Sequence, residues 1–505
     1  MFDVVISGLF SVLSWPAVGY MLLAIPIGLI FGMIPGLGGP TSLALLIPFT
    51  FGMDPVSGFA FLLGMHSVVH TSGSIPAILF DTPGTGPNAA TCIDGFPMAQ
   101  KGEAGRALGA ALFSSMVGGV IGAVCLGLAI PIVRPLVLSF GPAEFFMLSA
   151  LGLTFIALMS GDSILKGLMA GGMGLIISYV GMDPQTGAIR FCYGCLYLYE
   201  GLSLVVIVVG LFAMATVIEM AVEGGKSIAG EQAVTVQQKG GGVIDGIKDA
   251  IRRWTLVVRC SILGALIGMC PGLGGDAASF FTYGHAVQTS KHKELFGTGF
   301  VDGVIAPDSA HNAKEGGNLV PTLAFGIPGG AAMAILLGAF LIFGVVPGVE
   351  MFTKHLSLVY SMIWVLVIAN IIAVIICLPF AVKLAKVTFV RTSLIIPFIV
   401  VSAGMGAYLT TRNLGNLVVV LVAGFLGYGM KVCKYPRAPL LLGIVLGRIS
   451  ERNLMLALDL YGPKFIFRPI AFVLLLIMIV TVFYPIISKR LRKTKTTPTP
   501  AMWRG

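Results

Sequence analysis

Two interruptions of the same composition limit what this chain can fold into. The run Pro-Gly-Leu-Gly-Gly occurs at 35–39 inside apolar sequence, and it occurs again at 271–275. Such a run cannot remain helical, because proline lacks the amide hydrogen and glycine has high backbone freedom. Around both runs, apolar stretches fill most of the 505 residues, with only 11% charged side chains against roughly 25% in soluble proteins. The chain is therefore predicted to be a polytopic membrane protein with non-helical backbone inside the membrane.

Apolar runs bounded by Gly, Pro and charged residues predict the membrane spans. At about 20 residues for a crossing helix, the chain has room for roughly ten to fourteen spans or part-spans. The piece at 41–53 is too short to cross as a straight helix and is predicted to be half of a broken one. We expect an all-α fold that begins with a buried or amphipathic piece at 4–14. Further spans are predicted near 17–34, 56–70, 106–133, 142–160, 163–181, 196–221, 256–270, 331–347, 357–381, 393–409, 414–429, 437–448 and 465–487.

Charge marks the predicted domain boundaries. A polar stretch at 223–255 separates a first transmembrane repeat, 1–222, from a second, 256–488, and a basic tail follows at 489–505. The tail has five Lys and Arg residues between 489 and 495 and no acid. The positive-inside rule places the tail and the central polar stretch in the cytoplasm. The net charge of +10 has the same origin, and without an aromatic-interleaved basic face no nucleic-acid partner is expected.

The two halves of the chain contain matching landmarks in the same order. Gly32–Gly39 returns as Gly268–Gly275, a shift of 236 positions (268 − 32), and 75–84 matches 320–329 at a shift of 245 (320 − 75). The polar insert at 290–294 can absorb the difference. Paired Gly and Pro interruptions in two halves point to inverted repeats with a transport site between them. The alternative is that these residues only kink packed helices.

Each break is predicted to expose backbone that binds an anion. A helix should begin near residue 40 and another near residue 276, each with unpaired amides and the positive end of its dipole. Two such helix starts suit a substrate with two or more carboxylates, held without buried lysines. The second breaks, 83–86 and 328–330, would add further backbone groups. The predicted substrate-binding residues are Gly36, Gly38, Gly39, Thr41, Ser42, Gly84, Thr85, Gly272, Gly274, Gly275, Ser279 and Gly329, although the three hydroxyls outside the second breaks could equally cap their helices.

Coupling to a cation requires oxygen ligands of opposite sign. Ionisable residues at membrane depth are functional by default, because burying them is costly. Histidines are weaker candidates: His311 could titrate or be a hydrogen-bonded packing residue, and packing is favoured for His66 and His70. The predicted coupling-ion residues are Asp81, Asp276, Asp308 and Asn312, of which Asp276 could instead be the N-cap of its helix.

Several motifs together resemble one family. The doubled Pro-Gly-Leu-Gly-Gly, Ser-Ile-Pro-Ala-Ile-Leu at 74–79, the composite motif at 94–109, and the segments 180–187 and 438–443 are similar to the large membrane subunit of the tripartite tricarboxylate transporters. The resemblance extends over roughly 15 to 460.

The resemblance implies a secondary transporter in a bacterial inner membrane. Its partners would be a small four-span membrane subunit and a periplasmic solute-binding protein that delivers a carboxylate, such as a di- or tricarboxylate. A cation gradient would drive uptake, with sodium expected and protons as the alternative, and no other cofactor is implied. Two departures from the family pattern leave room for proton use: Asp308 and His311 stand where the family has Glu and a pair of Asn, and Asp81 stands where Asn is frequent.

Two other classes of protein fit the sequence less well than a coupled transporter. A membrane-embedded enzyme lacks support, because the chain has no HExxH motif and no paired aspartates of the protease type. A passive anion channel would fit the apolar composition, but broken helices in both halves favour alternating access. The pair Cys192 and Cys195 has no second ligand pair and is expected to pack rather than to bind metal. The sequence therefore predicts a transporter and not an enzyme.

Overall fold

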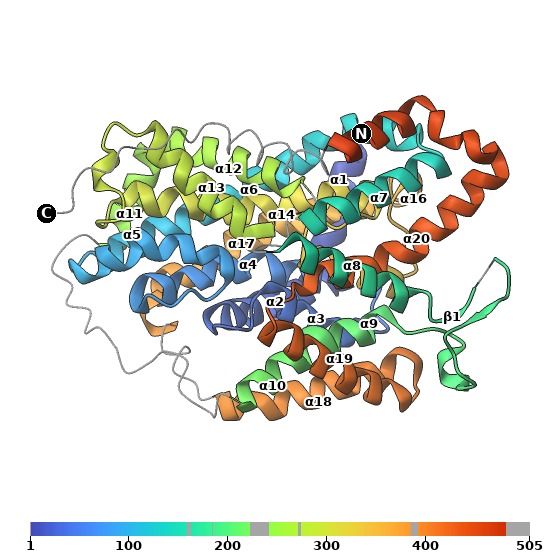
Figure 1. Ribbon diagram of the computed structural model, residues 1–505. Coiled ribbons are helices and arrows are strands. Elements are labelled where there is room, and N and C mark those ends of the chain that lie inside the picture. The colour runs from blue at the N-terminus through green and yellow to red at the C-terminus, as the bar shows by residue number, and fades with distance from the viewer. Residues whose placement is uncertain are drawn as a thin grey trace, which may run out of the picture.

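The computed structural model describes residues 2–158, 163–183, 185–222, 242–270, 274–384 and 392–480. Within these ranges the chain forms the helices α1 to α20, a last helix at Pro469–Val480, and one short antiparallel hairpin, in which β1 (Gly181–Met182) pairs with β2 (Ile189–Arg190). Figure 1 shows the hairpin projecting from one end of the helical body. The all-α prediction is confirmed for the residues that the structure describes.

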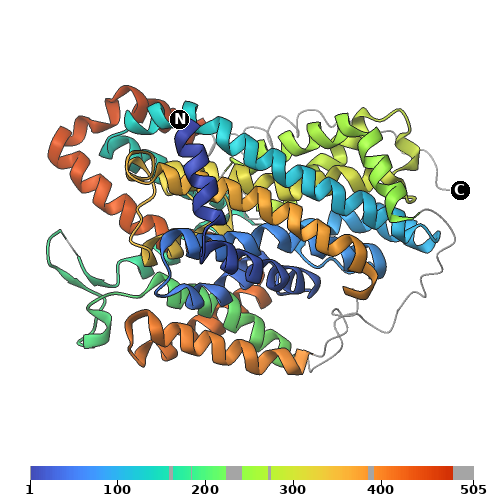
Figure 2. The ribbon, with the colours of Figure 1, turned by 180° about the vertical axis from the view of Figure 1, so that it is seen from behind.

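Two helices, one from each half of the chain, form the centre of the molecule. They are α4 (Pro55–Phe80) and α14 (Val301–Phe325), and nearly every residue of both is buried. Helices pack around this pair from all sides, and Figure 2 shows α6 and α17 side by side. The surrounding helices are α2 (Ala17–Met33), α5 (Ala89–Gln100), α6 (Ala104–Leu138), α12 (Trp254–Gly268), α13 (Gly274–Thr289) and α17 (Leu356–Leu384).

Glycines allow α6 to lie directly on α14. A Cβ placed on Gly118 would be 2.1 Å from the Ser309 carbonyl oxygen, and one on Gly122 would be 2.3 Å from that of Ala313. Small residues of this kind let two helix backbones approach closely, which is how helices associate in a membrane where apolar burial gives no drive. The sequence of α6 therefore decides how near α14 is held.

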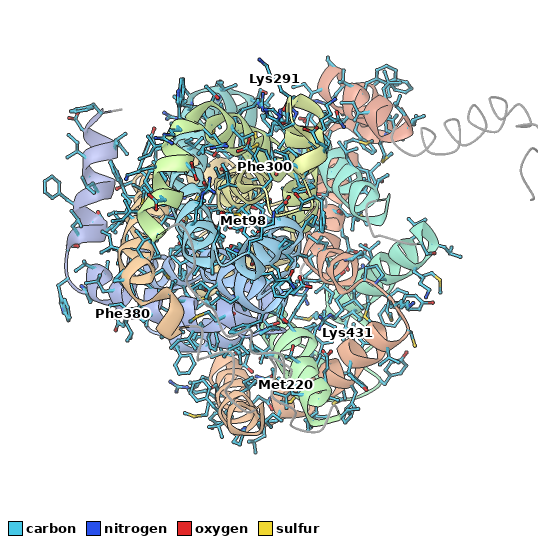
Figure 3. All side chains as sticks on the ribbon, turned by 90° about the vertical axis from the view of Figure 1, so that its left-hand side faces the viewer. Met98, Met220, Lys291, Phe300, Phe380 and Lys431 are labelled. Atoms are coloured by element: carbon cyan, nitrogen blue, oxygen red, sulfur yellow. The ribbon has the colours of Figure 1, made fainter. Side chains whose placement is uncertain are left out.

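Two further groups of helices flank the centre. One consists of α9 (Leu204–Val208), the π-helical segment η4 (Val209–Met214), α10 (Ala215–Val222), α18 (Thr392–Thr411) and α19 (Gly415–Val432). The other consists of α7 (Pro142–Leu158), α8 (Ile164–Ser178) and α20 (Arg437–Tyr461), which η7 (Gly462–Phe467) follows. Viewed from one end (Figure 3), Met98 lies near the middle of the body, and Met220 and Lys431 mark the first flanking group.

The remaining elements connect these groups. Helix α1 (Phe2–Leu13) packs on α17, and α11 (Val243–Arg252) packs on α6. Helices α3 (Gly39–Leu46) and α15 (Ala331–Ile342) contact each other and the first flanking group. Short elements complete the described chain: α16 (Val349–Thr353), η1 (Ile47–Thr50), η2 (Gly86–Asn88), η3 (Leu196–Leu198) and η5 (Lys293–Leu295).

The described helices make this a multi-pass membrane protein. Four of them are long and apolar enough to cross a membrane, or up to six if two pairs bent by 68° and 63° each count as one span. Shorter apolar helices, such as Gly39–Thr50 and Ala331–Ile342, supply part-spans. The other apolar helices of the described residues are too short to cross and belong to the part-spans that the expected ten to fourteen included.

One predicted boundary was wrong and one helix was missed, both for the same reason. The span predicted at 56–70 continues as α4 to Phe80, with Pro76 inside the helix, and α14 was not predicted as a span. Both helices carry polar side chains that face the interior of the protein, so low hydropathy hid helical segments that neighbouring helices bury. The charged boundaries are not tested, since 223–241 and 481–505 lie outside the described residues; the domain limits therefore stay predictions.

The internal repeat recurs as matched backbone contacts. A Cβ on Gly32 of α2 would lie 2.0 Å from the Val69 carbonyl oxygen of α4, and one on Gly268 of α12 would lie 2.4 Å from that of Lys314 of α14. These pairs are related by the two sequence shifts, 236 (268 − 32) and 245 (314 − 69). The same close crossing of helices is therefore built twice. The inverted orientation of the halves stays a prediction.

The second breaks match in the same way. Helix α4 ends on Asp81 with φ 52°, and α14 ends on Gly326 with φ 66°, both left-handed caps. Beyond them, a Cβ on Gly84 would lie 2.0 Å from the Gly32 carbonyl oxygen, and one on Gly329 would lie 2.9 Å from that of Gly268. Each second break thus folds back onto the end of the helix that precedes the first break of its own half.

Candidate functional site

The first Pro-Gly-Leu-Gly-Gly break directs a helix start at the buried centre. Gly36 has φ +90°, which favours glycine, and Gly38 is the N-cap of α3. A Cβ on Gly39 would lie 2.5 Å from His66 Cε1, and one on Gly38 would lie 3.8 Å from Thr85 Cγ2. The first turn of α3 therefore rests against His66 and the second break. As predicted, a helix follows this break.

Each first break is followed by a helix that packs beside the second break of the other half. Helix α3 packs on α15, which begins after the second break of the second half. Helix α13, which follows the second Pro-Gly-Leu-Gly-Gly, packs on η2 in the second break of the first half. The segments that sequence reasoning singled out thus meet in one region.

The hydroxyls near the breaks have different surroundings. Ser42 Oγ donates to the Leu37 and Gly38 carbonyl oxygens at 2.5 and 3.1 Å, so this hydroxyl serves its own turn. Thr41 is buried on the same helix. Ser279 of α13 is fully buried, and its Oγ has no hydrogen-bond partner in the described part of the chain. The geometry favours capping for Ser42 and leaves Ser279 available to a ligand.

A buried cluster of charged and titratable groups lies where α4 meets α14. His66 and His70 come from α4, and Lys314 and Glu315 come from α14; their exposed fractions are 1, 4, 5 and 2%. Lys314 Nζ donates to Glu315 Oε1 at 2.6 Å and lies 3.3 Å from His70 Nε2, which is 3.1 Å from the same Oε1. Burying an ion pair is costly unless further hydrogen bonds accompany it. Such a cluster, buried inside a multi-pass membrane protein, points to function.

His66 is the least satisfied member of this cluster. Its Nε2 lies 3.1 Å from Glu315 Oε2 but out of line for a hydrogen bond, and both its ring nitrogens lack a partner in the described residues. One ligand atom each from His66, His70 and Glu315 lies within 4.8 Å of the others, close enough to consider a metal ion. The Lys314 ammonium already stands beside His70 and Glu315, and its charge opposes a second cation there. These residues therefore form a charge cluster and not a metal site.

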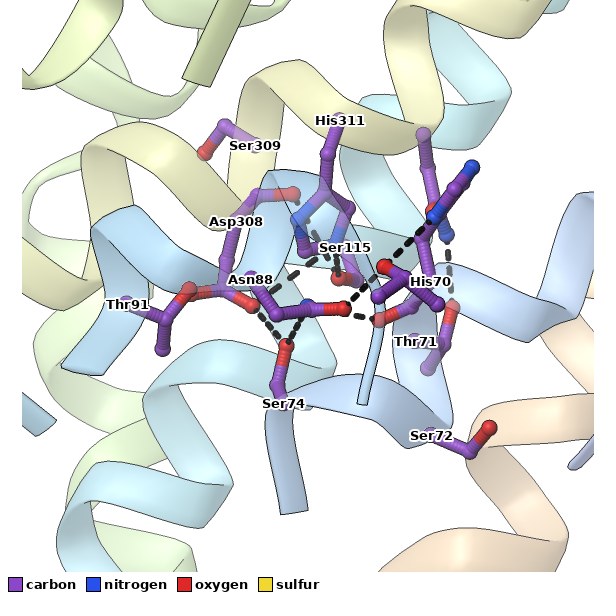
Figure 4. A network of polar contacts seen from close by, with 12 residues as sticks. His70, Thr71, Ser72, Ser74, Asn88, Thr91, Ser115, Asp308, Ser309 and His311 are labelled. Atoms are coloured by element: carbon purple, nitrogen blue, oxygen red, sulfur yellow. Dashed lines mark hydrogen bonds and ion pairs between the residues drawn. The ribbon is translucent and has the colours of Figure 1, made fainter. Parts of the chain in front are cut away.

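A chain of hydrogen bonds extends from this cluster across the centre (Figure 4). His70 Nδ1 lies 2.9 Å from Thr85 Oγ1, and the Thr85 hydroxyl donates to Asn88 Oδ1. Asn88 Nδ2 donates to the His70 carbonyl oxygen at 2.9 Å and to Ser74 Oγ at 2.8 Å. The Ser74 hydroxyl donates to Asp308 Oδ1 at 2.5 Å. The second break of the first half therefore connects the charge cluster to Asp308.

Asp308 lies at the far end of this network, and Asn312 follows one turn later on α14. Asp308 is fully buried, and its Oδ2 accepts from the Thr91 hydroxyl at 2.9 Å. Asn312 Nδ2 donates to Thr71 Oγ1 and to Asn370 Oδ1 at 2.6 and 2.7 Å. His311 Nε2 lies 2.7 Å from Ser115 Oγ of α6. These side chains are bound mainly to neutral hydroxyl and amide groups.

The structure brings some of the predicted residues together and separates others. Gly38, Gly39 and Thr85 border the charge cluster, and Asp308 and Asn312 belong to the same polar interior. Asp81, in contrast, is exposed at the end of α4. The other predicted glycines of the second breaks, Gly84 and Gly329, pack on backbone. Gly272 lies outside the described residues. Gly274, Gly275 and Asp276 belong to the first turn of α13, but the surroundings of their side chains are outside what the structure describes.

Sequence reasoning missed the charged centre of the site. It expected no buried lysine, yet Lys314 is 5% exposed, and it favoured simple packing for His70, which contacts Thr85 and Glu315. Two features of the sequence pointed to Glu315. Glu315 lies at helical spacing from Asp308 and His311, and the repeat shift of 245 makes it the equivalent of His70 (315 − 70).

The composite motif at 94–109 holds the segment that leads into α14. Asp94 of α5 is fully buried, and its Oδ1 accepts the amides of Gly297, Gly299 and Phe300 at 2.8–2.9 Å. Its Oδ2 accepts from the Tyr283 hydroxyl at 2.9 Å. A carboxylate that accepts several amides fixes a loop strongly. The motif therefore positions the start of the helix that carries Asp308 and Glu315.

Broken helices that meet around buried charges, in a multi-pass helical membrane protein, define a membrane transporter. The chain belongs to the tripartite tricarboxylate transporter TctA family, whose family model matches residues 18–442. This is a family of transporters rather than of enzymes, and its tripartite organisation implies further subunits.

Two proteins of Agrobacterium vitis are similar to this chain. One, described as "Uncharacterized 52.8 kDa protein in TAR-I ttuC' 3'region", is 34% identical over 462 residues, which cover 90% of this chain and 89% of that protein. The other, "Uncharacterized protein in TAR-II ttuC' 3'region", is 35% identical over 234 residues, 45% of this chain and 97% of that protein. No solved structure matches this chain.

Proposed function

We propose that this protein is the large membrane subunit of a secondary transporter that takes up a di- or tricarboxylate across a bacterial inner membrane. A periplasmic solute-binding protein delivers the substrate, a small four-span subunit completes the membrane unit, and a sodium or proton gradient drives accumulation. Family membership supports the substrate class and the partners. The basic tail supports a cytoplasmic C-terminus.

One observation carries this proposal: the first turn of α3 lies directly on the buried charge cluster. Gly38 and Gly39 offer amides at a helix N-terminus, and His66 and Thr85 lie against them. A substrate carboxylate bound by these amides would lie beside His66, whose Nε2 is 3.1 Å from Glu315, the ion-pair partner of the Lys314 ammonium. A site of this kind recognises carboxylate groups, while the binding protein selects the molecule.

The test is uptake by the reconstituted complex. The full chain is placed in proteoliposomes with its small subunit and its binding protein, and labelled citrate and succinate are supplied under imposed sodium or proton gradients. We expect accumulation above equilibrium that requires the binding protein. Uptake that continues after both gradients are collapsed would instead indicate a passive channel, and the absence of uptake with either probe would refute the proposal.

A matched pair of variants tests the site itself. Gly38→Leu places a large side chain at the start of α3, 3.8 Å from Thr85 at its Cβ, and should abolish uptake while the protein still inserts. Gly172→Leu makes the same change on α8, where a Cβ meets no atom within 4 Å, and should leave uptake within about twofold. Normal uptake by Gly38→Leu would contradict the assigned site.

A further inference from the structure

The hydrogen-bond chain determines where protons lie in the charge cluster. The His70 carbonyl oxygen can only accept, so the group of Asn88 that faces it at 2.9 Å must be the Nδ2 amide. Asn88 Oδ1 then faces Thr85 Oγ1 and can only accept, so the Thr85 hydroxyl gives its one proton to Asn88. Nothing is left for Thr85 to donate to His70.

His70 Nδ1 must therefore carry a proton and donate it to Thr85 Oγ1 at 2.9 Å. The second ring nitrogen, Nε2, faces Glu315 Oε1 at 3.1 Å. With a proton on Nε2, His70 is a cation that donates to the Glu315 carboxylate. Without that proton, two lone pairs face each other, and the Lys314 ammonium, 3.3 Å from Nε2 and 2.6 Å from Oε1, can donate to both.

Both protonation states are thus hydrogen bonded in one arrangement of side chains. Since neither state leaves a buried polar group of His70 or Lys314 unpaired, a proton can enter or leave without the cost of unsatisfied groups. The repeat makes this pair special, because His70 and Glu315 occupy equivalent positions in the two halves (315 − 70 = 245). The proton position lies at the contact between them.

We propose that the space between His70 Nε2 and Glu315 Oε1 is the binding site of the coupling proton, so that this transporter is a proton–carboxylate symporter. The inference rests on the proposed function and names its coupling ion. The proton comes from water on the side where the substrate enters, rests on Nε2 between the imidazole and the carboxylate, and leaves to water on the opposite side together with the substrate.

Charge explains why the proton and the substrate travel together. With both histidines neutral, Lys314 and Glu315 cancel, and the cluster has no net charge; with one proton bound, its net charge is +1. A positive charge in a buried site attracts an anion far more strongly than it would in water. The bound proton therefore raises affinity for a carboxylate at the neighbouring start of α3, and by reciprocity the carboxylate raises affinity for the proton.

The surroundings of the pair support titration at this position. Helix α4 contributes His66, and α14 contributes Asp308, His311 and Lys314. The groups that face the network from α6, α17 and η2 are neutral: Ser115, Asn370 and Asn88, next to Thr85. Asp308 accepts from two hydroxyls, and His66 makes no hydrogen bond among the described residues, so His70 and Glu315 are the hydrogen-bonded pair whose shared proton is undecided.

The experiment measures proton uptake on substrate binding. The purified complex of the full chain and its small subunit is placed in weak buffer with a pH indicator, and succinate or citrate adjusted to the same pH is added. We expect uptake of up to one proton per bound carboxylate and an affinity that falls about tenfold or more as the pH rises through the titration. In proteoliposomes, a proton gradient without sodium should drive accumulation.

Two variants should respond in opposite directions. Glu315→Gln leaves the Lys314 charge unbalanced, which resembles the protonated state, so carboxylate affinity should stay high and independent of pH. His70→Gln cannot bind the proton, so affinity should stay low and independent of pH. Neither variant should take up protons on binding. His292→Gln and Glu294→Gln, an exposed pair 3.6 Å apart outside the network, are the matched controls and should behave like the unmodified protein.

The outcomes separate this inference from the proposed function. If sodium alone drives accumulation and substrate binding takes up no proton, the proton site is wrong and the transporter function stands. If neither gradient drives uptake, the proposed function itself fails. A pH dependence of affinity in Glu315→Gln equal to that of the unmodified protein would also overturn the inference, and the proton measurement on the unmodified protein decides the question should a variant not fold.

Discussion

Gly39→Ala is the substitution whose effect can be worked out most directly from the structure. Gly39 is in the first turn of α3, and its φ is one that any L-residue adopts, so alanine causes no backbone strain. Helix propensity alone favours alanine over glycine by about 1 kcal/mol. The new Cβ, however, would lie 2.5 Å from His66 Cε1 and 2.8 Å from His66 Nδ1, against ordinary contacts of roughly 3.5–4 Å.

The His66 ring must therefore move by roughly 1 Å, and it has little room to do so. Its side chain is 1% exposed, and its Nε2 already lies 3.1 Å from Glu315 Oε2. Overpacking of this kind costs about 1–3 kcal/mol. If that cost falls on the transporting state, then at about 1.4 kcal/mol for each factor of ten, uptake drops roughly fivefold to 150-fold. Net stability should change by less, because the propensity gain offsets part of the cost.

The assay is initial uptake of labelled succinate into proteoliposomes, with thermal unfolding of the same samples. Gly172→Ala, where a Cβ meets no atom within 4 Å, is the control. A double-mutant cycle with His66→Ala isolates the clash: Gly39→Ala should cost uptake in the unmodified background and almost nothing further when His66 is already alanine. Additive losses, or unchanged uptake by Gly39→Ala, would refute the role of this contact.

Three further substitutions test other parts of the fold. Asp94→Ala leaves three amides, those of residues 297, 299 and 300, without their acceptor, so thermal unfolding should show a loss of about 3 kcal/mol or more; an unchanged melting temperature would count against this role. Gly118→Ala, with a Cβ 2.1 Å from the Ser309 carbonyl oxygen, should reduce folded yield severely, whereas Gly127→Ala, with its nearest atom at 3.8 Å, should not. The Thr186 hydroxyl, the Gln185 amide and Arg190 hold the pKa of Asp183 below its usual range. The carboxylate therefore stabilises the hairpin above the unfolded pKa of about 3.9, and this contribution is lost as the pH falls through the lower folded pKa. Hydrogen exchange of the hairpin should show the loosening in acid, and Asp183→Asn should remove this loosening.

Much of the architecture followed from local patterns. The Pro-Gly-Leu-Gly-Gly run at 35–39 predicted a break and a new helix, and α3 begins at Gly39. The spans predicted at 106–133 and 357–381 correspond to α6 and α17, because long apolar runs have few alternatives to a helix. The motif at 94–109 predicted the family correctly. In each case the signal lies within a short stretch of chain.

The charge cluster could not be read in this way. Hydropathy did not indicate that α14 is a buried helix, because Asp308, Lys314 and Glu315 lower its apolar character. The helix is nevertheless buried almost throughout. The residues next to His66 and His70 in the sequence give no sign of partners, and only the repeat shift relates His70 to Glu315, 245 positions away (315 − 70). Only the packing of α4 on α14 decided which charges meet.

The sequence by itself determined that this chain lies in a membrane, that its helices break twice in matching places, and to which family it belongs. These properties depend on composition and on neighbouring residues, where proline, glycine and apolar side chains act locally. The tertiary structure alone decided that His70 faces Glu315 and Lys314, and that α3 starts against His66. Contacts between distant segments arise from how helices pack. In the low dielectric of the packed interior, a single bound proton attracts an anion more strongly than it would in water.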